Sequence, residues 1–415
     1  MSTLAPDGRT EPLVVRSREI ADPGDLIGLL PPTSDALAWV HGGDGLVGWG
    51  RAASYEPDGS ERFAAADDWW ADLVESSVTR DEVELAGSGL VAFGSFTFAA
   101  EPGSTLVVPE VVVGRRDGRS WVTTIGRALA PSPALTQGTT RHPVGTTLAD
   151  DPERRDAWTH TVERAVQRIQ AGELDKVVLA RAVDAHFDEP LDLRSPLSRL
   201  AERYRSCWTF HVDGFFGSTP EMLVRLDGGL VTSRVLAGTI RRTGDDAHDL
   251  ALAASLAHSS KDLEEHEYAV RSVADALAPH CTAMNVPESP FVLHLPNVMH
   301  LATDVTGVLR DRSGALNLVE SLHPSAAVGG TPTAAAVRLI AQIEDLDRGR
   351  YAGPVGWIGA GGDGEWGIGL RSARLSHDGR SARLFAGCGI IADSSPADEL
   401  AEADAKLIPV RDALS

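Results

Sequence analysis

The chain has 415 residues, of which 43% are hydrophobic and 23% charged, a composition typical of a globular protein with two or three domains or one large two-lobed domain. A formal net charge of −21, with no run of Lys and Arg, argues against nucleic acid or a membrane surface as a partner. The three cysteines are far apart and suit neither a disulfide framework nor zinc, and the start of the chain lacks the apolar stretch of a signal peptide, so we expect a reduced, cytoplasmic environment.

Residues 1–150 are predicted to be rich in β-strands. Val, Phe, Trp and Gly recur with partial alternation in residues 36–50, 89–98 and 106–115. A segment rich in Pro, Thr and Gly follows at residues 130–151 and indicates a connector. We therefore expect the chain to divide near residue 150.

The second part of the chain carries clearer signals for helices and strands. Residues 153–171 have one apolar face, and Gly172 follows them, which predicts an amphipathic helix. The remaining patterns predict strands and helices at residues 176–183 (strand), 215–240 (several short strands), 261–277 (helix), 354–369 and 382–391 (strands) and 396–407 (helix). Because strands and helices mix without a βαβ rhythm, the fold class is predicted to be α+β.

Lysine is rare in this chain, which uses Arg for all but three of its 38 basic residues, Lys176, Lys261 and Lys406. An ammonium group, unlike a guanidinium, loses its proton when it is desolvated. Lys176 begins an apolar strand, where it serves either as a protective charge on an edge strand or as a buried base. Glu221 lies between a turn and an apolar strand and is either an ordinary turn acid or a carboxyl group that its surroundings keep protonated.

Two predicted helices present carboxylates along one face. Asp262 and Glu265 share a face of the first, and Glu399, Glu402 and Lys406 follow the i, i+3, i+7 spacing on the second. The second helix is predicted to start with a capping box between Ser395 and Asp398. Oxygen donors without Cys or His suit Mg²⁺, although a solvated acidic face is the alternative for either pair.

Two glycine-rich segments, residues 237–239 and 386–389, have the composition of backbone that approaches an anion closely. Neither is a P-loop or a dinucleotide fingerprint. Taken alone, each is also explained by a β-turn or a bulge.

In this order, these segments resemble the chorismate-binding enzymes, the family of isochorismate, salicylate, anthranilate and aminodeoxychorismate synthases. The matching stretches lie within residues 150–412 and include all three lysines: residues 176–181, 217–221, 236–239, 260–266, 323–324, 353–356, 369–371, 386–390 and 394–406. The resemblance implies a two-lobed α+β fold, like that of anthranilate synthase component I, with large and mostly antiparallel sheets, outer helices and a central cleft. Residues 1–150 would be its variable N-terminal β-rich part, and residues 151–415 the chorismate-binding catalytic region.

The resemblance also implies a site. Glu265 and Glu402 would bind Mg²⁺, with Asp262 and Glu399 nearby, and the ion would take the ring carboxylate of chorismate. The carboxylates and the enolpyruvyl group of the substrate would be held by the side chains of Arg371, Tyr351 and Lys406 and the backbone of Gly238, Thr239, Gly387 and Gly389.

Within the family, Lys176 points to water as the nucleophile, because members that use ammonia typically lack a lysine at this position. Lys176 would take a proton from a water that attacks C2, and Glu221 would donate one to the departing C4 hydroxyl. The implied activity is that of an isomerase, isochorismate synthase, which feeds menaquinone or siderophore biosynthesis.

Salicylate synthases share Lys176 and Glu221 and then eliminate pyruvate, and they tend to carry Thr where this chain has Ala327. Ala327 therefore favours isochorismate as the final product, with salicylate synthase as the alternative. A non-catalytic chorismate-binding protein is an alternative of another class, although it would be expected to have lost one of the catalytic or metal-binding residues. No amphipathic surface demands a partner, so we expect a monomer.

Overall fold

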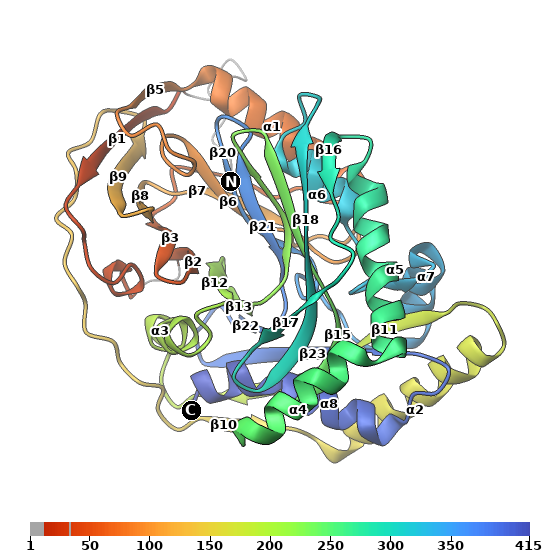
Figure 1. The fold of residues 1–415 in the computed structure, drawn as a ribbon. Coiled ribbons are helices and arrows are strands. Elements are labelled where there is room, and N and C mark those ends of the chain that lie inside the picture. The colour runs from red at the N-terminus through yellow and green to blue at the C-terminus, as the bar shows by residue number, and fades with distance from the viewer. Residues whose placement is uncertain (1–11, 33–34) are drawn as a thin grey trace.

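The computed structural model describes residues 12–32 and 35–415, apart from the side chain of Lys261. These residues form two large sheets with helices on the outside (Figure 1), which confirms the expected α+β fold. Among the described strands, β1 and β5 pair in parallel, and the other pairs are antiparallel. The start of the chain, which the sequence analysis distinguished from a signal peptide, falls partly outside the described residues.

The first sheet has 13 strands. In spatial order they are β10 (Thr147–Ala149), β11 (Lys176–His186), β23 (Ser381–Ile390), β22 (Ser372–Leu375), β13 (Phe215–Thr219), β12 (Trp208–Val212), β2 (Leu37–His41), β3 (Asp44–Trp49), β8 (Val111–Arg116), β9 (Arg119–Gly126), β1 (Val14–Ile20) and β5 (Val78–Asp81), and β19 (Gly330–Thr331) pairs with β11.

The second sheet has 10 strands. Their order is β16 (Cys281–Asn285), β18 (Val298–Leu309), β15 (Leu230–Arg241), β14 (Met222–Asp227), β21 (Gly364–Ile368), β20 (Pro354–Gly359), β6 (Val91–Ser95), β7 (Thr105–Val108) and β4 (Ala53–Tyr55), and β17 (Phe291–His294) pairs with β18. Strands from before and after residue 150 pair directly in both sheets, β2 with β12 and β6 with β20. The N-terminal part is therefore built into the same two sheets as the rest of the chain.

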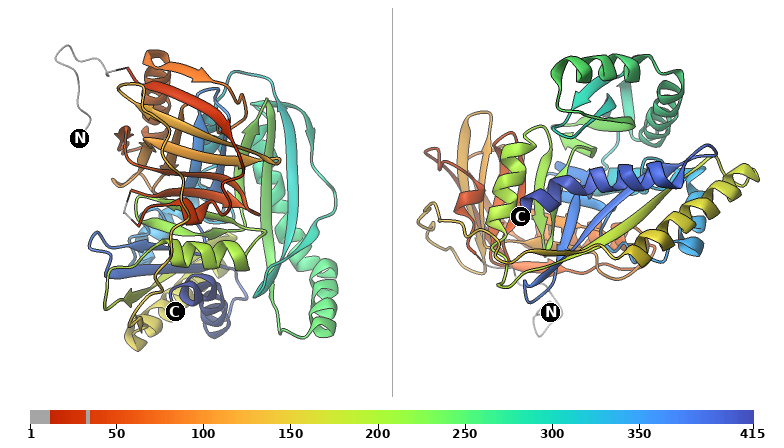
Figure 2. Two further views of the ribbon diagram at one scale, coloured as in Figure 1. Left: turned by 90° about the vertical axis from the view of Figure 1, so that its left-hand side faces the viewer. Right: turned by 90° about the horizontal axis from the view of Figure 1, so that it is seen from below.

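The helices cover the outer faces of the sheets, as the two further views show (Figure 2). They are α1 (Arg62–Ser76), α2 (Pro152–Gln170), α3 (Arg194–Arg203), α4 (Asp246–His258), α5 (Ser260–Leu277), α6 (Ala315–Leu322), α7 (Thr333–Ile343) and α8 (Pro396–Ala413), with a short 3₁₀ turn at Ile27–Leu29. α4 and α5 pack on β15 and β18, whereas α8 packs on β23 beside α2 and α3. No described helix is both long and apolar enough to cross a bilayer.

Helix α2 forms as its sequence predicts. Asp151 caps it by accepting a hydrogen bond from the Glu153 N–H at 3.0 Å, Pro152 occupies the first turn, and Gly172 follows the helix with a φ of +80°. Trp158 and Val162 lie on its buried face, and the Trp158 indole N–H donates to the Ala180 carbonyl of β11 at 2.9 Å. This contact fixes α2 on the strand that begins with Lys176.

Two local features differ from the sequence predictions. The β-rich N-terminal part also contains α1, whose buried Phe63, Ala66, Trp70 and Leu73 recur at helical spacing. The predicted capping box of α8 is wrong, because within the described residues the Ser395 side chain makes no capping hydrogen bond. Instead, the Ser394 hydroxyl donates to the Glu399 carboxylate at 2.6 Å.

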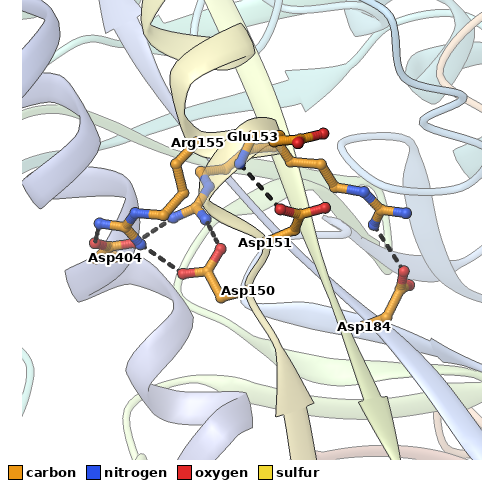
Figure 3. Close-up of polar contacts among 8 residues, drawn as sticks. Asp150, Asp151, Glu153, Arg155, Asp184 and Asp404 are labelled. Carbon is orange, nitrogen blue, oxygen red and sulfur yellow. Dashed lines mark hydrogen bonds and ion pairs between the residues drawn. The ribbon is translucent and has the colours of Figure 1, made fainter.

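A network of ion pairs fastens α8 to the rest of the fold. Asp150 of the connector and Asp404 of α8 each contact both Arg155 of α2 and Arg181 of β11. Figure 3 shows Arg155 between the two carboxylates. The Arg181 side chain is only 4% exposed, so a loss of its partners would leave a buried charge uncompensated. The network therefore sets where α8 lies against the first sheet.

Candidate active site

A cavity of about 330 Å³ lies where the chain passes between the two sheets. Glu221 sits between β13 of the first sheet and β14 of the second, and Arg371 sits between β21 of the second sheet and β22 of the first. The structure brings every predicted site residue to the wall of this cavity: Lys176, Glu221, Gly238, Thr239, Asp262, Glu265, Tyr351, Arg371, Gly387, Gly389, Glu399, Glu402 and Lys406. We refer to it as the catalytic cavity.

Glu221 has the strongest electrostatic perturbation among the carboxyl groups of the cavity. Burial raises its pKa to about 8, even though the positive charges of Lys176, Lys406 and Arg371 oppose this shift. A carboxyl group with this pKa is mostly protonated at neutral pH and therefore carries a proton that it can donate. The predicted state of Glu221 is thus the one that its surroundings favour.

Lys176 stands at the start of β11 and contacts the carboxylate of Glu265 on α5. Its backbone pairs with Thr331 of β19, while the next residues pair with β23, so Lys176 is not a protective charge on a free edge. Gly389 of β23 leaves the space that the lysine occupies, because a Cβ there would lie 2.6 Å from the Lys176 Cε atom. A larger residue at position 389 would therefore displace the end of the Lys176 side chain from its present position.

Helix α8 contributes a second lysine–carboxylate pair. The Lys406 ammonium lies 2.5 Å from the Glu402 carboxylate, and it also donates to the Gly387 carbonyl at 3.1 Å. Burial raises the pKa of Glu402, but the charge and hydrogen bond of Lys406 outweigh burial and hold this pKa below its ordinary value. Burial raises the pKa of Glu399, one turn earlier, although its carboxylate accepts from Ser394. Glu402 is therefore the better anionic ligand of the two.

The four acidic residues predicted to hold Mg²⁺ come from α5 and α8. Among the described residues, no three Asp, Glu, His or Cys side chains are close enough together to hold a metal ion. Glu265 and Glu402 are instead each bound to a lysine. The donor chemistry still fits Mg²⁺, because the carboxylates of Asp262, Glu265, Glu399 and Glu402 offer hard oxygen atoms around one cavity.

Arg371 provides a buried cation that is suited to an anionic ligand. Its Nη2 donates to the His300 Nε2 atom at 3.3 Å, whereas its Nη1 is buried without a hydrogen-bond partner among the described residues. An unpaired buried guanidinium N–H is costly, so a partner from outside the chain is favoured here. A substrate carboxylate has the geometry and charge to fill that role.

His300 is a functional residue that the sequence analysis missed. It lies in β18, directly opposite Thr239 of β15, and burial, followed by the charges of Arg371 and Lys406, holds its pKa well below the ordinary value. The neutral ring accepts from Arg371 at Nε2, so its proton lies on Nδ1 and is donated to the Thr239 hydroxyl at 2.9 Å. His300 thus orients both Arg371 and Thr239. An isolated histidine in a strand carries no motif that could have revealed this.

Other parts of the wall are shaped by packing. The Tyr351 ring stacks on Phe385 with centroids 5.2 Å apart, and burial raises the pKa of its hydroxyl. Gly238 interrupts the register of β15 at a bulge, and its φ of +78° is a conformation that favours glycine. Ala327, which the sequence analysis singled out for product choice, also lines the catalytic cavity.

Known proteins resemble this chain in sequence. The family model described as chorismate binding enzyme matches residues 39–415. The Bacillus subtilis isochorismate synthase MenF is 37% identical over 264 residues, which span 63% of this chain and 56% of that protein. The salicylate biosynthesis isochorismate synthase of Pseudomonas aeruginosa is 33% identical over 97% of this chain and 90% of its own length.

Solved structures give the same result. The menaquinone-specific isochorismate synthase MenF of Escherichia coli aligns with a TM-score of 0.81 at 25% identity, over 98% of this chain and 96% of that one. Anthranilate synthase component I of Streptococcus pneumoniae aligns with a TM-score of 0.69 at 20% identity, over 88% and 91% of the two chains, and supports the fold alone. The chain belongs to the chorismate-binding enzyme family.

Proposed function

We propose that this protein is an isochorismate synthase that depends on Mg²⁺ and converts chorismate into isochorismate. The observation that carries the proposal is the buried Glu221, whose pKa of about 8 equips it as a general acid in the same cavity as Lys176. The relatives named as isochorismate synthases, at 33% to 40% identity, support this activity and its class, an isomerase. An overall isomerisation results because one water is added and one is released.

The reaction needs an acid and a base at two ring positions. Glu221 donates its proton to the C4 hydroxyl, which leaves as water while the double bonds of the ring shift. Lys176 accepts a proton from the water whose oxygen forms the new bond at C2. Each group contributes about 10²–10⁴-fold to the rate in enzymes of this kind.

The remaining polar groups hold the substrate. The unpaired Nη1 of Arg371 donates to a carboxylate of chorismate, and His300 keeps the guanidinium in place. Tyr351, Lys406 and the backbone at Gly238, Gly387 and Gly389 complete the wall around the enolpyruvyl group. Alignment of the ring between Glu221 and Lys176 follows from these contacts.

Glu265 and Glu402 would hold the Mg²⁺ ion, with Asp262 and Glu399 beside them. The ion would supply positive charge that neutralises and positions the ring carboxylate. With the ion bound, Glu265 and Glu402 would be its ligands, and Lys176 and Lys406 would then be available to water and substrate.

Isochorismate is proposed as the final product because the small Ala327 stands in the cavity wall. Salicylate synthase remains the second candidate, since it uses the same acid and base. The relatives include isochorismate synthases named for menaquinone and for dihydroxybenzoate formation, so both menaquinone and siderophore pathways are proposed destinations. The net charge of −21 argues against nucleic acid and membranes as partners. The three free, buried cysteines support a cytoplasmic location, and the protein is proposed to be a monomer.

The test is to incubate the purified protein with chorismate and Mg²⁺ and to identify the products by chromatography and mass spectrometry. A mixture of chorismate and isochorismate, absent with EDTA, is expected. Equimolar salicylate and pyruvate would replace the product assignment by salicylate synthase. Binding of chorismate and Mg²⁺ without turnover, seen as thermal stabilisation alone, would instead identify a non-catalytic binding protein.

A further inference from the structure

A second cavity, of about 430 Å³, adjoins the catalytic cavity beside Lys176. We call it the side groove. It runs between α5 and the segment that leads from α6 to β19, and it is lined by Asp175, Lys176, Glu264, Glu265, Tyr268, Ala269, Ala326, Thr331 and Ile391. Tyr268 is 57% exposed, so the groove opens to solvent on the outer side of α5.

The side groove and the catalytic cavity share one thin wall. Lys176, Glu265 and Ile391 line both, and Lys176 contacts the Glu265 carboxylate within this wall. Two consecutive alanines show how thin the wall is, because Ala326 lines the side groove and Ala327 lines the catalytic cavity. Because Lys176 itself lines the side groove, a molecule in the groove can contact the proposed base directly.

The side groove lacks the cations that are proposed to hold chorismate. Arg371 and Lys406 line the catalytic cavity and are not among the described residues around the side groove, where Lys176 is paired with Glu265. Water needs no cation to bind, and the volume of the groove is many times the ~30 Å³ that one water occupies in the liquid.

The proposed reaction needs water to arrive and to leave at different places. A water oxygen bonds to C2 as its proton passes to Lys176, and the C4–O bond breaks as Glu221 gives its proton to the departing hydroxyl, which leaves as water. Lys176 lines both cavities, whereas Glu221 lines the catalytic cavity and is not among the described residues around the side groove. The site of water uptake therefore faces the side groove, and the site of water release does not.

We propose that the side groove is the route by which the attacking water reaches Lys176 while chorismate fills the catalytic cavity. The inference rests on the proposed function and adds a solvent path to it. Chorismate itself enters through the catalytic cavity, whose wall carries Arg371 and Lys406. The two reactants thus approach the same lysine from opposite sides of one wall.

The test narrows the groove from Ala326, which is partly buried and outside the catalytic cavity. In the series Ala326→Val, Ala326→Leu and Ala326→Phe, the kcat for isochorismate at saturating chorismate and Mg²⁺ should fall stepwise, by about tenfold or more for Phe. The KM for chorismate should stay within about twofold, since the substrate does not use the groove. Unchanged kcat throughout the series would overturn the proposal, as would a rise in KM with kcat unchanged.

Two further variants distinguish a blocked water route from a general disturbance of the fold. Ala334→Leu, an equal enlargement at an exposed position of α7 away from the groove, should leave kcat unaltered. Tyr268→Ala on the opposite wall, combined with Ala326→Leu, should restore part of the lost kcat by reopening the groove. A double variant as slow as Ala326→Leu alone, or a slow Ala334→Leu, would contradict the route.

The wild-type enzyme in the same assay keeps the two hypotheses apart. If it forms no isochorismate from chorismate and Mg²⁺, the proposed function fails. If it turns over and the narrowed variants turn over equally fast, the function stands and the solvent route alone is wrong.

Discussion

The catalytic cavity contains two lysine–glutamate pairs of similar burial and very different construction. The Lys406–Glu402 pair lies within one helix at i, i+4 spacing, and the Lys176–Glu265 pair joins the start of β11 to α5 across 89 residues of sequence. Exposure does not distinguish them, since the lysine side chains are 15% and 16% exposed. One pair is a local property of a helix, whereas the other exists only because a sheet and a helix meet.

The surroundings of the two pairs differ as well. α8 is held by the buried Arg181 network and by packing between α2 and α3, so its pair is fixed in place. α5 lies on the second sheet and borders both the catalytic cavity and the side groove. The Lys406–Glu402 pair therefore stands on a helix anchored by several other elements, whereas the Lys176–Glu265 pair stands between two cavities.

The largest effect is expected from breaking each pair in turn. Lys176→Ala should lower kcat by about 10²–10⁴-fold, because the proposed base is lost. Lys406→Ala should act mainly on the KM for chorismate, by about tenfold, because it removes a charged contact in ground state and transition state alike. Steady-state kinetics of both variants check this, and a loss of kcat in Lys406→Ala as large as that in Lys176→Ala would remove the distinction.

Glu221, which lines the same cavity as these two pairs, leads to a prediction about the pH dependence of kcat. Because Glu221 acts in its protonated form, kcat should fall as the pH rises through about 8. Glu221→Gln should lower kcat by about 10²–10⁴-fold at pH 7. A pH–rate profile of the wild-type enzyme tests the first statement, and full activity at pH 9.5 (on the order of one and a half units above this pKa) would contradict it.

The same group predicts a pH-dependent stability. Its folded pKa of about 8 lies above the ordinary 4.5, so the stability that Glu221 contributes is fully present below about pH 4.5 and is lost as the pH rises through 8. The side chain introduced by Glu221→Gln does not titrate. The free energy of unfolding of this variant should therefore rise relative to that of the wild type by ~1.4 kcal/mol per pH unit between these values. Urea unfolding of both proteins at pH 5 and pH 8 measures the difference, which should not change with pH if Glu221 is ionised in the folded protein.

The next prediction concerns the ion pairs that hold α8 on the first sheet. Arg181→Met should reduce the free energy of unfolding by about 1–3 kcal/mol, since Asp150 and Asp404 lose the charged hydrogen bonds from Arg181 but stay partly exposed and paired with Arg155. The matched control is Arg154→Met, which breaks an exposed pair with Asp184 and should cost at most about 1 kcal/mol. Denaturant titrations of the two variants measure the loss in free energy of unfolding. Equal losses would mean that the burial of Arg181 does not strengthen its ion pairs.

The smallest expected effect concerns the N-terminal caps of α5 and α8. The Ser259 hydroxyl accepts from the Asp262 N–H at 3.3 Å at the start of α5, whereas Ser395 makes no such bond in the described structure. Ser259→Ala should therefore cost about 1 kcal/mol, and Ser395→Ala close to nothing. Thermal unfolding of the two variants is the measurement, and an equal loss would restore the capping box predicted for α8.

Much of the site was predictable because its residues lie in short stretches with local rules. The i, i+3, i+7 spacing of Glu399, Glu402 and Lys406 places them on one helical face in any fold, and the structure puts that face on the cavity. The α+β class and the family were confirmed. The family match also begins at residue 39, far earlier than the stretches that carried the resemblance, and strands of this N-terminal part pair with later ones in the structure.

The features that were missed depend on contacts between distant segments. His300 matters because β18 places it opposite Thr239 and beside Arg371, and nothing near it in the sequence indicates this. The side groove likewise exists because α5 approaches the segment around Ala326. The capping bond predicted for Ser395 is absent from the described structure, and the neighbouring Ser394 bonds to the Glu399 side chain.

By itself, the sequence determined the fold class, the family and the set of charged residues that meet in the cavity. The periodicity of a helix or strand is set by backbone geometry, so a face can be predicted from spacing alone. The tertiary structure decided which groups are desolvated and which are paired. Glu221 keeps its proton because its surroundings bury it, and Lys176 meets Glu265 because the start of β11 and a side chain of α5 reach the same cavity. Burial and charge pairing depend on residues far apart in the chain, and no local pattern encodes them.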